Sequence, residues 1–134
     1  MYLIDTNVVS EVRKQNADPR VDSWWRENVS QSHFSVVTLA EMRLGISLLK
    51  SGRSRHELEA WFNRFRNVHA ESILAIDEDV ALIWGEFLAE SGADISARDS
   101  LLAATARAYG LTVATRDEGP FKHTGITTVN PWKG

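Results

Sequence analysis

Short apolar runs alternate along the chain with longer stretches in which apolar residues recur every three or four positions. The short runs predict strands, and they lie at residues 2–4, 33–36, 72–76, 111–115 and 126–129. The longer stretches predict helices, because apolar side chains at that spacing fall on one helical face. Two of these stretches are residues 38–50 and an alanine-rich segment that begins at Ser96 and ends at Gly110.

Several of the expected helices have recognisable starts. Asp18 followed by Pro19 is typical of a helix start, because proline is tolerated in the first turn. Ser54 and Glu57 have the spacing of a capping box, which predicts a further helix after Ser54. Asp77 is placed to cap the helix that follows the third expected strand.

Strands separated by helices predict a parallel sheet with helices on both faces, and therefore a three-layer α/β/α domain. A chain of 134 residues is long enough for one such domain and too short for two. In domains of this class, ligands bind beyond the carboxyl ends of the strands.

The composition excludes several classes of protein. The chain is 43% hydrophobic and 25% charged, which is ordinary for a soluble globular protein. It has no cysteine, which excludes disulfides, thiol catalysis and thiolate metal sites. No apolar run approaches the length of a membrane span, so we expect a cytoplasmic protein with no membrane association. The net charge of −3 does not indicate nucleic-acid binding by bulk charge.

The charge is unevenly spread. Residues 43–66 carry six basic residues and two acidic ones, whereas residues 71–99 carry eight acidic residues and a single basic one, Arg98. Both segments can be solvated helix faces. Guidance of an RNA backbone is an equal alternative for the basic segment, whose arginines are Arg43, Arg53, Arg55, Arg64 and Arg66.

Four carboxylates lie where a parallel sheet places its chemistry. Asp5 ends the first expected strand, and Asp117 follows the fourth by two residues. Asp99 lies in the first turn of the helix before the fourth strand, and Glu41 lies about one turn into the helix after the second. Three of these are at strand ends or helix starts, which the sheet would bring to one edge.

Each acid also has a purely structural interpretation. Asp5 and Asp99 could stabilise helix starts, and Asp117 could be a turn residue. Glu41 is harder to explain in this way, because its helical neighbours Val37, Leu44 and Leu48 are apolar. A carboxylate on an apolar stripe costs free energy unless it is paired or bound to a metal.

A set of carboxylates without histidine or cysteine ligands selects a hard divalent cation, Mg²⁺ or Mn²⁺. Such an ion can activate water for the hydrolysis of a phosphodiester. The chain contains none of the sequence motifs for phosphate loops, dinucleotide binding or serine hydrolases, so those functions have no support. The sequence therefore predicts metal-dependent cleavage of a phosphate ester.

Four segments resemble motifs of PIN-domain proteins. They are YLIDTNVVSE at residues 2–11, TLAEMRLG at 38–45, DSLLAATA at 99–106 and LTVATRD at 111–117. Two further segments, DEGPF at 117–121 and NPW at 130–132, resemble the VapC toxins of the FitB-like branch of that family. The resemblance covers essentially residues 1–134 and implies a single PIN domain with a five-stranded parallel sheet in the order 3-2-1-4-5.

The resemblance also implies a function and a site. It implies a ribonuclease toxin of a type II toxin–antitoxin pair, with a cognate antitoxin, an RNA substrate, a homodimer or toxin–antitoxin hetero-oligomer, and operator DNA bound only through the antitoxin. The residues that match the family's metal-binding acids are Asp5, Glu41, Asp99 and Asp117, and those that match its supporting polar residues are Thr6, Asn7 and Thr115. The alternative is a catalytically weak PIN-like binding module that acts through an antitoxin complex on operator DNA.

The helix at residues 38–50 carries two apolar stripes, although one usually suffices for a core. One stripe continues from Val37 through Leu44 and Leu48. The second stripe indicates either a partner surface or deep burial of the helix. Because the family's antitoxin packs an amphipathic segment into a groove on the toxin, we expect this stripe to bind it. That stripe consists of Leu39, Met42, Ile46 and Leu49.

Overall fold

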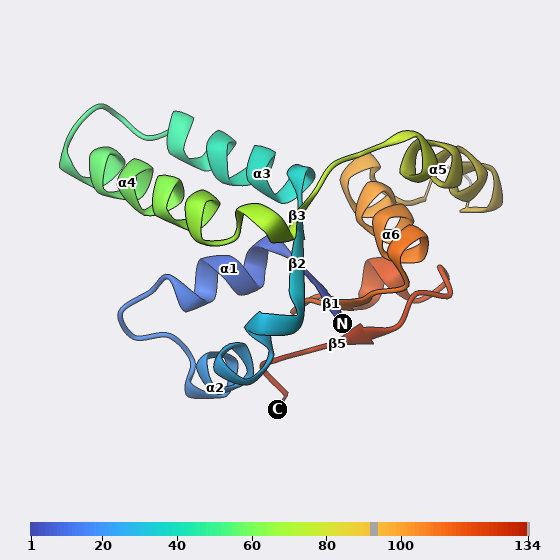
Figure 1. The fold of residues 1–134 in the computed structure, drawn as a ribbon, viewed down its shortest axis with the longest axis horizontal. Coiled ribbons are helices and arrows are strands. Elements are labelled where there is room, and N and C mark those ends of the chain that lie inside the picture. The colour runs from blue at the N-terminus through green and yellow to red at the C-terminus, as the bar shows by residue number, and fades with distance from the viewer. Residues whose placement is uncertain (92–93, 134) are drawn as a thin grey trace.

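A single five-stranded parallel sheet forms the centre of the molecule (Figure 1). The computed structural model describes residues 1–91 and 94–133. The strand order is β3-β2-β1-β4-β5, which confirms the predicted order. The strands are β1 (Tyr2–Ile4), β2 (Ser32–Ser35), β3 (Ile73–Leu74), β4 (Thr112–Ala114) and β5 (Thr128–Val129).

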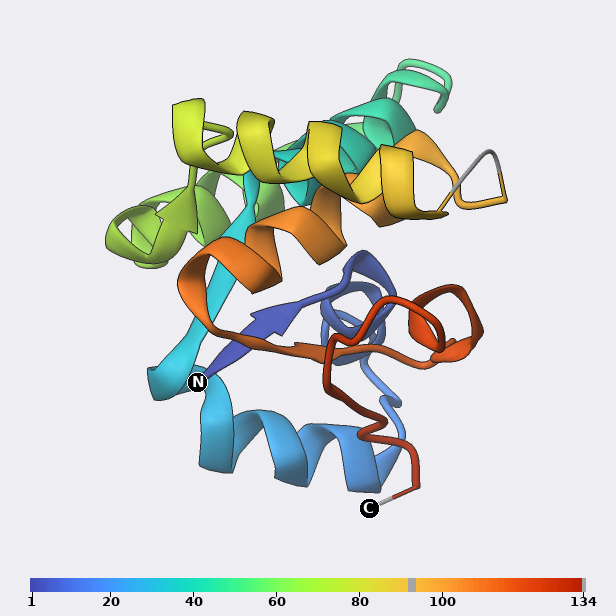
Figure 2. The same cartoon turned by 90° about the vertical axis from the view of Figure 1, so that its right-hand side faces the viewer.

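Helices cover both faces of this sheet, which confirms the three-layer α/β/α architecture. Figure 2 shows α5 and α6 on one side of the sheet and α2 on the other. The helices are α1 (Thr6–Val12), α2 (Pro19–Asn28), α3 (Val36–Ser47), α4 (Arg53–Val68), α5 (Glu78–Ser91) and α6 (Ala97–Tyr109). None of the helices in the described ranges is both long and apolar enough to cross a membrane.

The alternation of side chains along each strand divides the core in two. Leu3 and Val113 point to the face where residues of α5 and α6 complete one apolar cluster. Ile4 and Ala114, the next residue in each strand, belong to a second cluster with residues of α1, α2 and α4. Neighbouring residues in a strand face opposite sides of a sheet, so two-residue apolar pairs are what a sheet covered on both faces requires.

The register of β1 and β4 brings their carboxyl ends to the same level. Ile4 is the partner of Ala114, and the backbone N–H of Asp5 donates to the Ala114 carbonyl at 2.9 Å. Thr115, the residue directly after β4, donates its own N–H to the Val129 carbonyl at 2.9 Å. Asp5 and Thr115 therefore lie side by side at the edge where the candidate site was expected.

Most predicted helix ends are confirmed. The Asp18 side chain accepts from the Arg20 N–H, and the Asp77 side chain accepts from the Val80 N–H at 3.0 Å. The Ser96 side chain accepts from the Asp99 N–H at 3.1 Å.

The capping box at Ser54 is wrong. Helix α4 already begins at Arg53, directly after Gly52, whose φ of 150° is rarely adopted by residues with a side chain. The Glu57 carboxylate accepts from the Arg53 guanidinium at 3.1 Å, an i,i+4 pair on the helix surface. The Glu57 carboxylate is therefore paired with Arg53 and does not cap the start of the helix.

Gly110 ends α6 in the left-handed conformation, with φ 65° and ψ 39°, and a Cβ there would meet no atom within 4 Å. We expect Gly110→Ala to lower the free energy of unfolding by about 1 kcal/mol, because the cost is conformational rather than steric. Gly85, inside α5, also has open space around it, and Gly85→Ala should raise the free energy of unfolding by about 0.5–1 kcal/mol. Urea unfolding of both variants checks this, and equal midpoints would contradict it.

Candidate active site

The Asp5 carboxylate is the buried centre of the candidate site, with only 3% of the side chain exposed. Asp5 caps α1, and its Oδ1 accepts from the Thr6 N–H at 2.7 Å. Its Oδ2 accepts from the Thr115 hydroxyl at 2.8 Å. The end of β1, the start of α1 and the end of β4 thus hold this carboxylate in one orientation.

Glu41 reaches the same place from α3. Its Oε1 accepts from the Thr6 hydroxyl at 2.6 Å, a contact between residues 35 positions apart in the chain. The sequence argument for Glu41, an acid on a buried apolar stripe, is wrong in its premise, because Leu44 is 59% and Leu48 is 76% exposed. Glu41 lies at the site because of its polar partners rather than because an apolar face forces it there.

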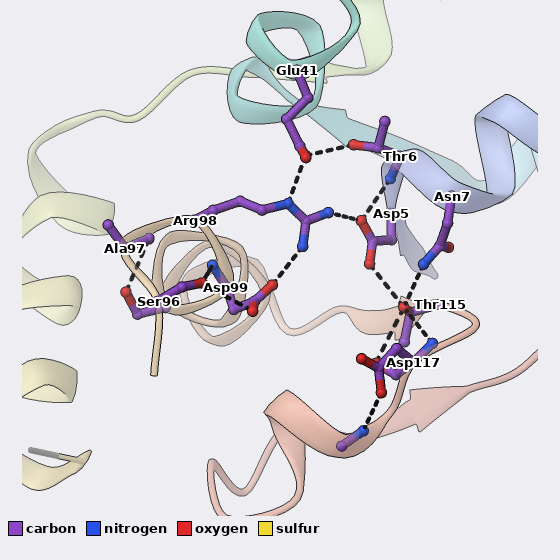
Figure 3. A network of polar contacts seen from close by, with 12 residues as sticks. Asp5, Thr6, Asn7, Glu41, Ser96, Ala97, Arg98, Asp99, Thr115 and Asp117 are labelled. Atoms are coloured by element: carbon purple, nitrogen blue, oxygen red, sulfur yellow. Dashed lines mark hydrogen bonds and ion pairs between the residues drawn. The ribbon is translucent and has the colours of Figure 1, made fainter. Parts of the chain in front are cut away.

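Asp99 approaches from the first turn of α6. Its side chain is 18% exposed, and its Oδ2 accepts from the Ser96 hydroxyl at 2.9 Å. Since the Asp99 N–H also donates to Ser96 Oγ, the serine and the aspartate fix each other at the helix start. This arrangement points Asp99 Oδ1 toward Asp5 and Glu41 (Figure 3).

Arg98 lies between these three carboxylates, and the sequence analysis did not assign it to the site (Figure 3). Its Nε donates to Glu41 Oε1 at 2.7 Å, its Nη2 to Asp5 Oδ1 and its Nη1 to Asp99 Oδ1. The one signal in the sequence was that Arg98 is the single basic residue among eight acids in residues 71–99.

The surroundings keep Arg98 firmly charged. Burial of the guanidinium alone would lower the pKa of Arg98. The hydrogen bond with Glu41 and the negative charges of the three carboxylates outweigh that effect, so the pKa is raised above its ordinary value. A guanidinium with several planar donors suits this position better than a single ammonium group.

Asp117 is close in space but joined to the others only indirectly. Its side chain is exposed, and its Oδ1 accepts from the Gly119 N–H at 3.2 Å. Its own N–H donates to the Thr115 hydroxyl at 3.2 Å. The three acids that share Arg98 are therefore Asp5, Glu41 and Asp99, and the metal-binding role of all four predicted acids stays a prediction.

The predicted supporting residues form a polar network at the strand ends. Asn7 Nδ2 donates to the Thr115 hydroxyl oxygen at 3.3 Å, and Asn7 Oδ1 accepts from the Arg116 N–H at 3.3 Å. Thr115 is fully buried, and its hydroxyl lies against Asp5, Asn7 and the Asp117 backbone. Through these contacts, α1 and the loop after β4 hold each other in place.

A further buried acid, Glu11, does not belong to this group. It is 8% exposed, and its carboxylate accepts from the Asp18 N–H at 2.9 Å and from Lys14 Nζ at 3.0 Å. The hydrogen bond from the Asp18 backbone is the main reason that the pKa of Glu11 is lowered. Glu11 therefore secures the turn between α1 and α2.

The donor set fits a hard divalent cation, although the observed conformation is closed around the guanidinium. Within residues 1–91 and 94–133, no three His, Asp or Glu side chains lie close enough together to hold a metal ion. The carboxylates of Asp5, Glu41 and Asp99 nevertheless converge on one positive group, and every donor atom is an oxygen. Mg²⁺ and Mn²⁺ prefer such oxygen donors.

The expected partner stripe on α3 is largely part of the core. Ile46 is 1% exposed, and Leu39 and Met42 pack against the apolar cluster that contains Phe34. This stripe is therefore not a free helix face; three of its residues, Met42, Ile46 and Leu49, line a groove instead. The most exposed leucines of this segment are Leu44 in α3 and Leu48 just after it. The reason is that α1 and α4 cover the side of α3 that carries Ile46.

Two surface spaces adjoin the acids. A groove of about 390 Å³ runs between α1, α3 and α4 and is lined by Met42, Ile46, Leu49 and Trp61 among others, with Glu41 in its wall. A separate hollow of about 380 Å³ is lined by two acids, Glu11 and Glu41, and by three cationic residues, Lys14, Arg98 and Arg116. Glu41 thus borders both spaces.

The structure thus defines the class of this protein as an α/β/α domain that gathers carboxylates at the carboxyl edge of a five-stranded parallel sheet. The family model for the PIN domain matches residues 2–126 of this chain. The chain therefore belongs to the PIN domain family.

Similarity to individual proteins extends along nearly the whole chain. The toxin FitB of Neisseria gonorrhoeae is 37% identical over 98% of this chain and 99% of its own length. The VapC ribonuclease Y4jK of Sinorhizobium fredii is 33% identical, with 99% of each chain covered. The crystal structure of FitAcB from Neisseria gonorrhoeae matches with a TM-score of 0.88 at 36% identity, over 98% of this chain and 99% of that one.

We expect Thr115→Val to lower the free energy of unfolding by about 1–3 kcal/mol, because it removes the hydroxyl that supports the buried Asp5 carboxylate. Thr38 is a matched control: it is also fully buried, and its hydroxyl has no hydrogen-bond partner among the described residues. Thr38→Val should leave the free energy of unfolding unchanged or raise it. Urea unfolding measures both, and an equal loss in the two variants would show that the Thr115 network does not stabilise the fold.

Proposed function

We propose that this chain is the toxin of a type II toxin–antitoxin pair and acts as an Mg²⁺-dependent endoribonuclease, with Mn²⁺ as an alternative ion. One observation carries the proposal: Asp5, Glu41 and Asp99, from three separate elements, direct their carboxylates at a single positive group at the carboxyl edge of the sheet. The similarity to FitB, described as a toxin, and to Y4jK, described as a VapC ribonuclease, supports it.

Asp5 and Asp99 are the residues that would hold the ion, with Glu41 and Asp117 completing its surroundings. When bound, the ion supplies a water molecule of lowered pKa and offsets negative charge on the phosphate. The chain's own contribution is orientation: Thr6 and Thr115 hold Asp5, Ser96 holds Asp99, and no backbone rearrangement is needed to present them.

The hollow beside the acids suits an RNA backbone. Its lining holds three cations, Lys14, Arg98 and Arg116, against two acids, Glu11 and Glu41, so cations are in excess beside the acidic centre. Phosphates are positioned by such cations, which carry no sequence information of their own. A local patch of this kind allows a chain of net charge −3 to bind RNA at one place.

Asp99→Asn tests the nuclease proposal. It removes one negative charge from the site and keeps the size of the side chain, and we expect cleavage of a structured RNA in Mg²⁺ to fall by about two orders of magnitude or more. Asp94→Asn is the control, since Asp94 is an exposed acid in the preceding loop, and its cleavage rate should equal that of the wild type.

The same assay identifies the reaction by its products. Hydrolysis by water leaves 5′-phosphate and 3′-hydroxyl ends, and cleavage should stop in EDTA. Cleavage that persists in EDTA, or 2′,3′-cyclic phosphate ends, would contradict the mechanism. A complete lack of cleavage by the wild type would favour the alternative, a binding module that acts only through its antitoxin.

The groove between α1, α3 and α4 supports an antitoxin as partner. Its apolar lining fits an amphipathic segment of another protein. Glu41, one of the site acids, and its partner Thr6 also line the groove. An occupant of the groove would therefore obstruct the site directly. A solved structure of FitAB, with a chain 36% identical to this one, is bound to a DNA fragment, which supports operator DNA as a ligand of the complex rather than of this chain alone.

A homodimer is part of the same proposal. Leu44 on α3, Leu48 just after α3 and Leu82 on α5 are exposed, at 59%, 76% and 63%. Exposed leucines outside the groove supply apolar surface that a second copy of the chain could cover.

Leu49→Glu tests the groove as the antitoxin site. Leu49 lines the groove and is 39% exposed, so a charge there should weaken antitoxin binding at least about tenfold, while the domain stays folded. Val68→Glu is the control: Val68, the last residue of α4, is 75% exposed and outside the groove lining, so the change should leave the affinity unaltered. Titration calorimetry with the antitoxin measures both. Normal binding by Leu49→Glu would exclude the groove.

A further inference from the structure

The guanidinium of Arg98 uses each of its three nitrogens on a different carboxylate. Nε contacts Glu41, Nη2 contacts Asp5 and Nη1 contacts Asp99. The three acids come from the end of β1, from α3 and from the start of α6, whereas Arg98 is the residue directly before Asp99. A side chain of the protein itself thus occupies the common centre of the acids (Figure 3).

We propose that Arg98 is a displaceable internal counterion: it holds the acids together while no metal is bound, and a divalent cation must displace its guanidinium to reach them. The proposal rests on the proposed function only in that the site binds a metal. It makes Arg98 a positioning residue for the carboxylates and a competitor of the ion.

The oxygens held by Arg98 are the ones that a cation needs. The other oxygens of Asp5 and Asp99, both named Oδ2, accept from the hydroxyls of Thr115 and Ser96 at 2.8 and 2.9 Å. The oxygens that face the centre, Asp5 Oδ1, Asp99 Oδ1 and Glu41 Oε1, are those engaged by the guanidinium. Binding of an ion at the centre therefore requires these contacts to break.

The charges favour such an exchange only when the ion is divalent. Three carboxylates carry a charge of about −3, and one guanidinium offsets a third of it. A divalent ion offsets more, and it also binds at shorter distances than a hydrogen-bonded guanidinium does. The guanidinium thus reduces the repulsion among the acids but leaves negative charge that a divalent ion can offset further.

The displaced side chain has a place to go. Arg98 is 32% exposed and lines the hollow of about 380 Å³ that also contains Lys14 and Arg116. Rotation of the side chain into this hollow leaves the helix intact. The hollow is also the proposed site of the RNA backbone. A substrate phosphate there could therefore pair with the displaced guanidinium.

Arg98→Gln tests the exchange by metal binding without RNA. Removal of the competitor should tighten Mn²⁺ binding by about tenfold or more, because the ion no longer has to displace a guanidinium from the three carboxylates. In EDTA the same variant should unfold at a lower temperature than the wild type, because the three acids lose their counterion. Its stabilisation by Mn²⁺ should be correspondingly larger.

Two further variants make the result specific. Arg116→Gln removes a cation that lines the same hollow and contacts the Trp132 ring, with 5.0 Å from its Cζ to the ring centroid, so a general effect of charge would appear there too. We expect its Mn²⁺ affinity to stay within about twofold of the wild type. Arg98→Lys keeps the charge but not the three-way contact, and should bind Mn²⁺ with intermediate affinity. It replaces Arg98→Gln if that variant does not fold in EDTA.

Titration calorimetry and thermal melts in EDTA and in Mn²⁺ decide between the outcomes. Equal or weaker Mn²⁺ binding by Arg98→Gln, with normal binding by the wild type, would overturn the role of Arg98 and leave the proposed function standing. Binding by none of the four proteins would overturn the metal site itself, and the proposed nuclease with it. Mn²⁺ binding by Arg98→Gln at least about tenfold tighter than by Arg116→Gln would support the exchange.

Discussion

The arrangement of this molecule depends on the neutralisation of one buried carboxylate. Asp5 is 3% exposed, and a charge so deeply buried is tolerated only with partners. Those partners are the Thr6 N–H, the Thr115 hydroxyl and the Arg98 guanidinium. They belong to the start of α1, the end of β4 and the start of α6, so the requirement for partners fixes how three elements meet around the end of β1. The sheet register and the position of α6 are therefore part of the same constraint.

Much of the fold followed from local patterns, and the candidate acids followed from where those patterns ended. Asp5 and Asp99 were found because a strand end and a helix start are recognisable in the sequence, whereas the strand order came from the resemblance to PIN domains. Arg98 was missed, because a single arginine beside acids is typical of a solvated helix surface. Its role arises from Glu41 in α3, 57 residues away, and no local pattern indicates that contact.

Helix α3 shows why burial could not be assigned from periodicity. Its two apolar stripes are equivalent in the sequence, yet Ile46 is 1% and Leu48 is 76% exposed. The difference is made by α1 and α4, which cover one stripe and leave the other free. The strands show a related limit: residues 72–76 were predicted to pair, and β3 contains only Ile73 and Leu74. The length of an edge strand depends on its one neighbour, β2, rather than on its own hydrophobicity.

Glu41 forms a shared wall between the apolar groove and the cationic hollow. Its carboxylate is bound to Thr6 on one side and to Arg98 on the other, so a change on either side alters the free energy of the same group. Two ligands that act on one group in this way are thermodynamically linked. The factor by which a partner in the groove changes the affinity of the hollow for RNA must equal the factor by which RNA changes the affinity of the groove for the partner. Bound RNA would therefore alter partner binding as strongly as the bound partner alters RNA binding.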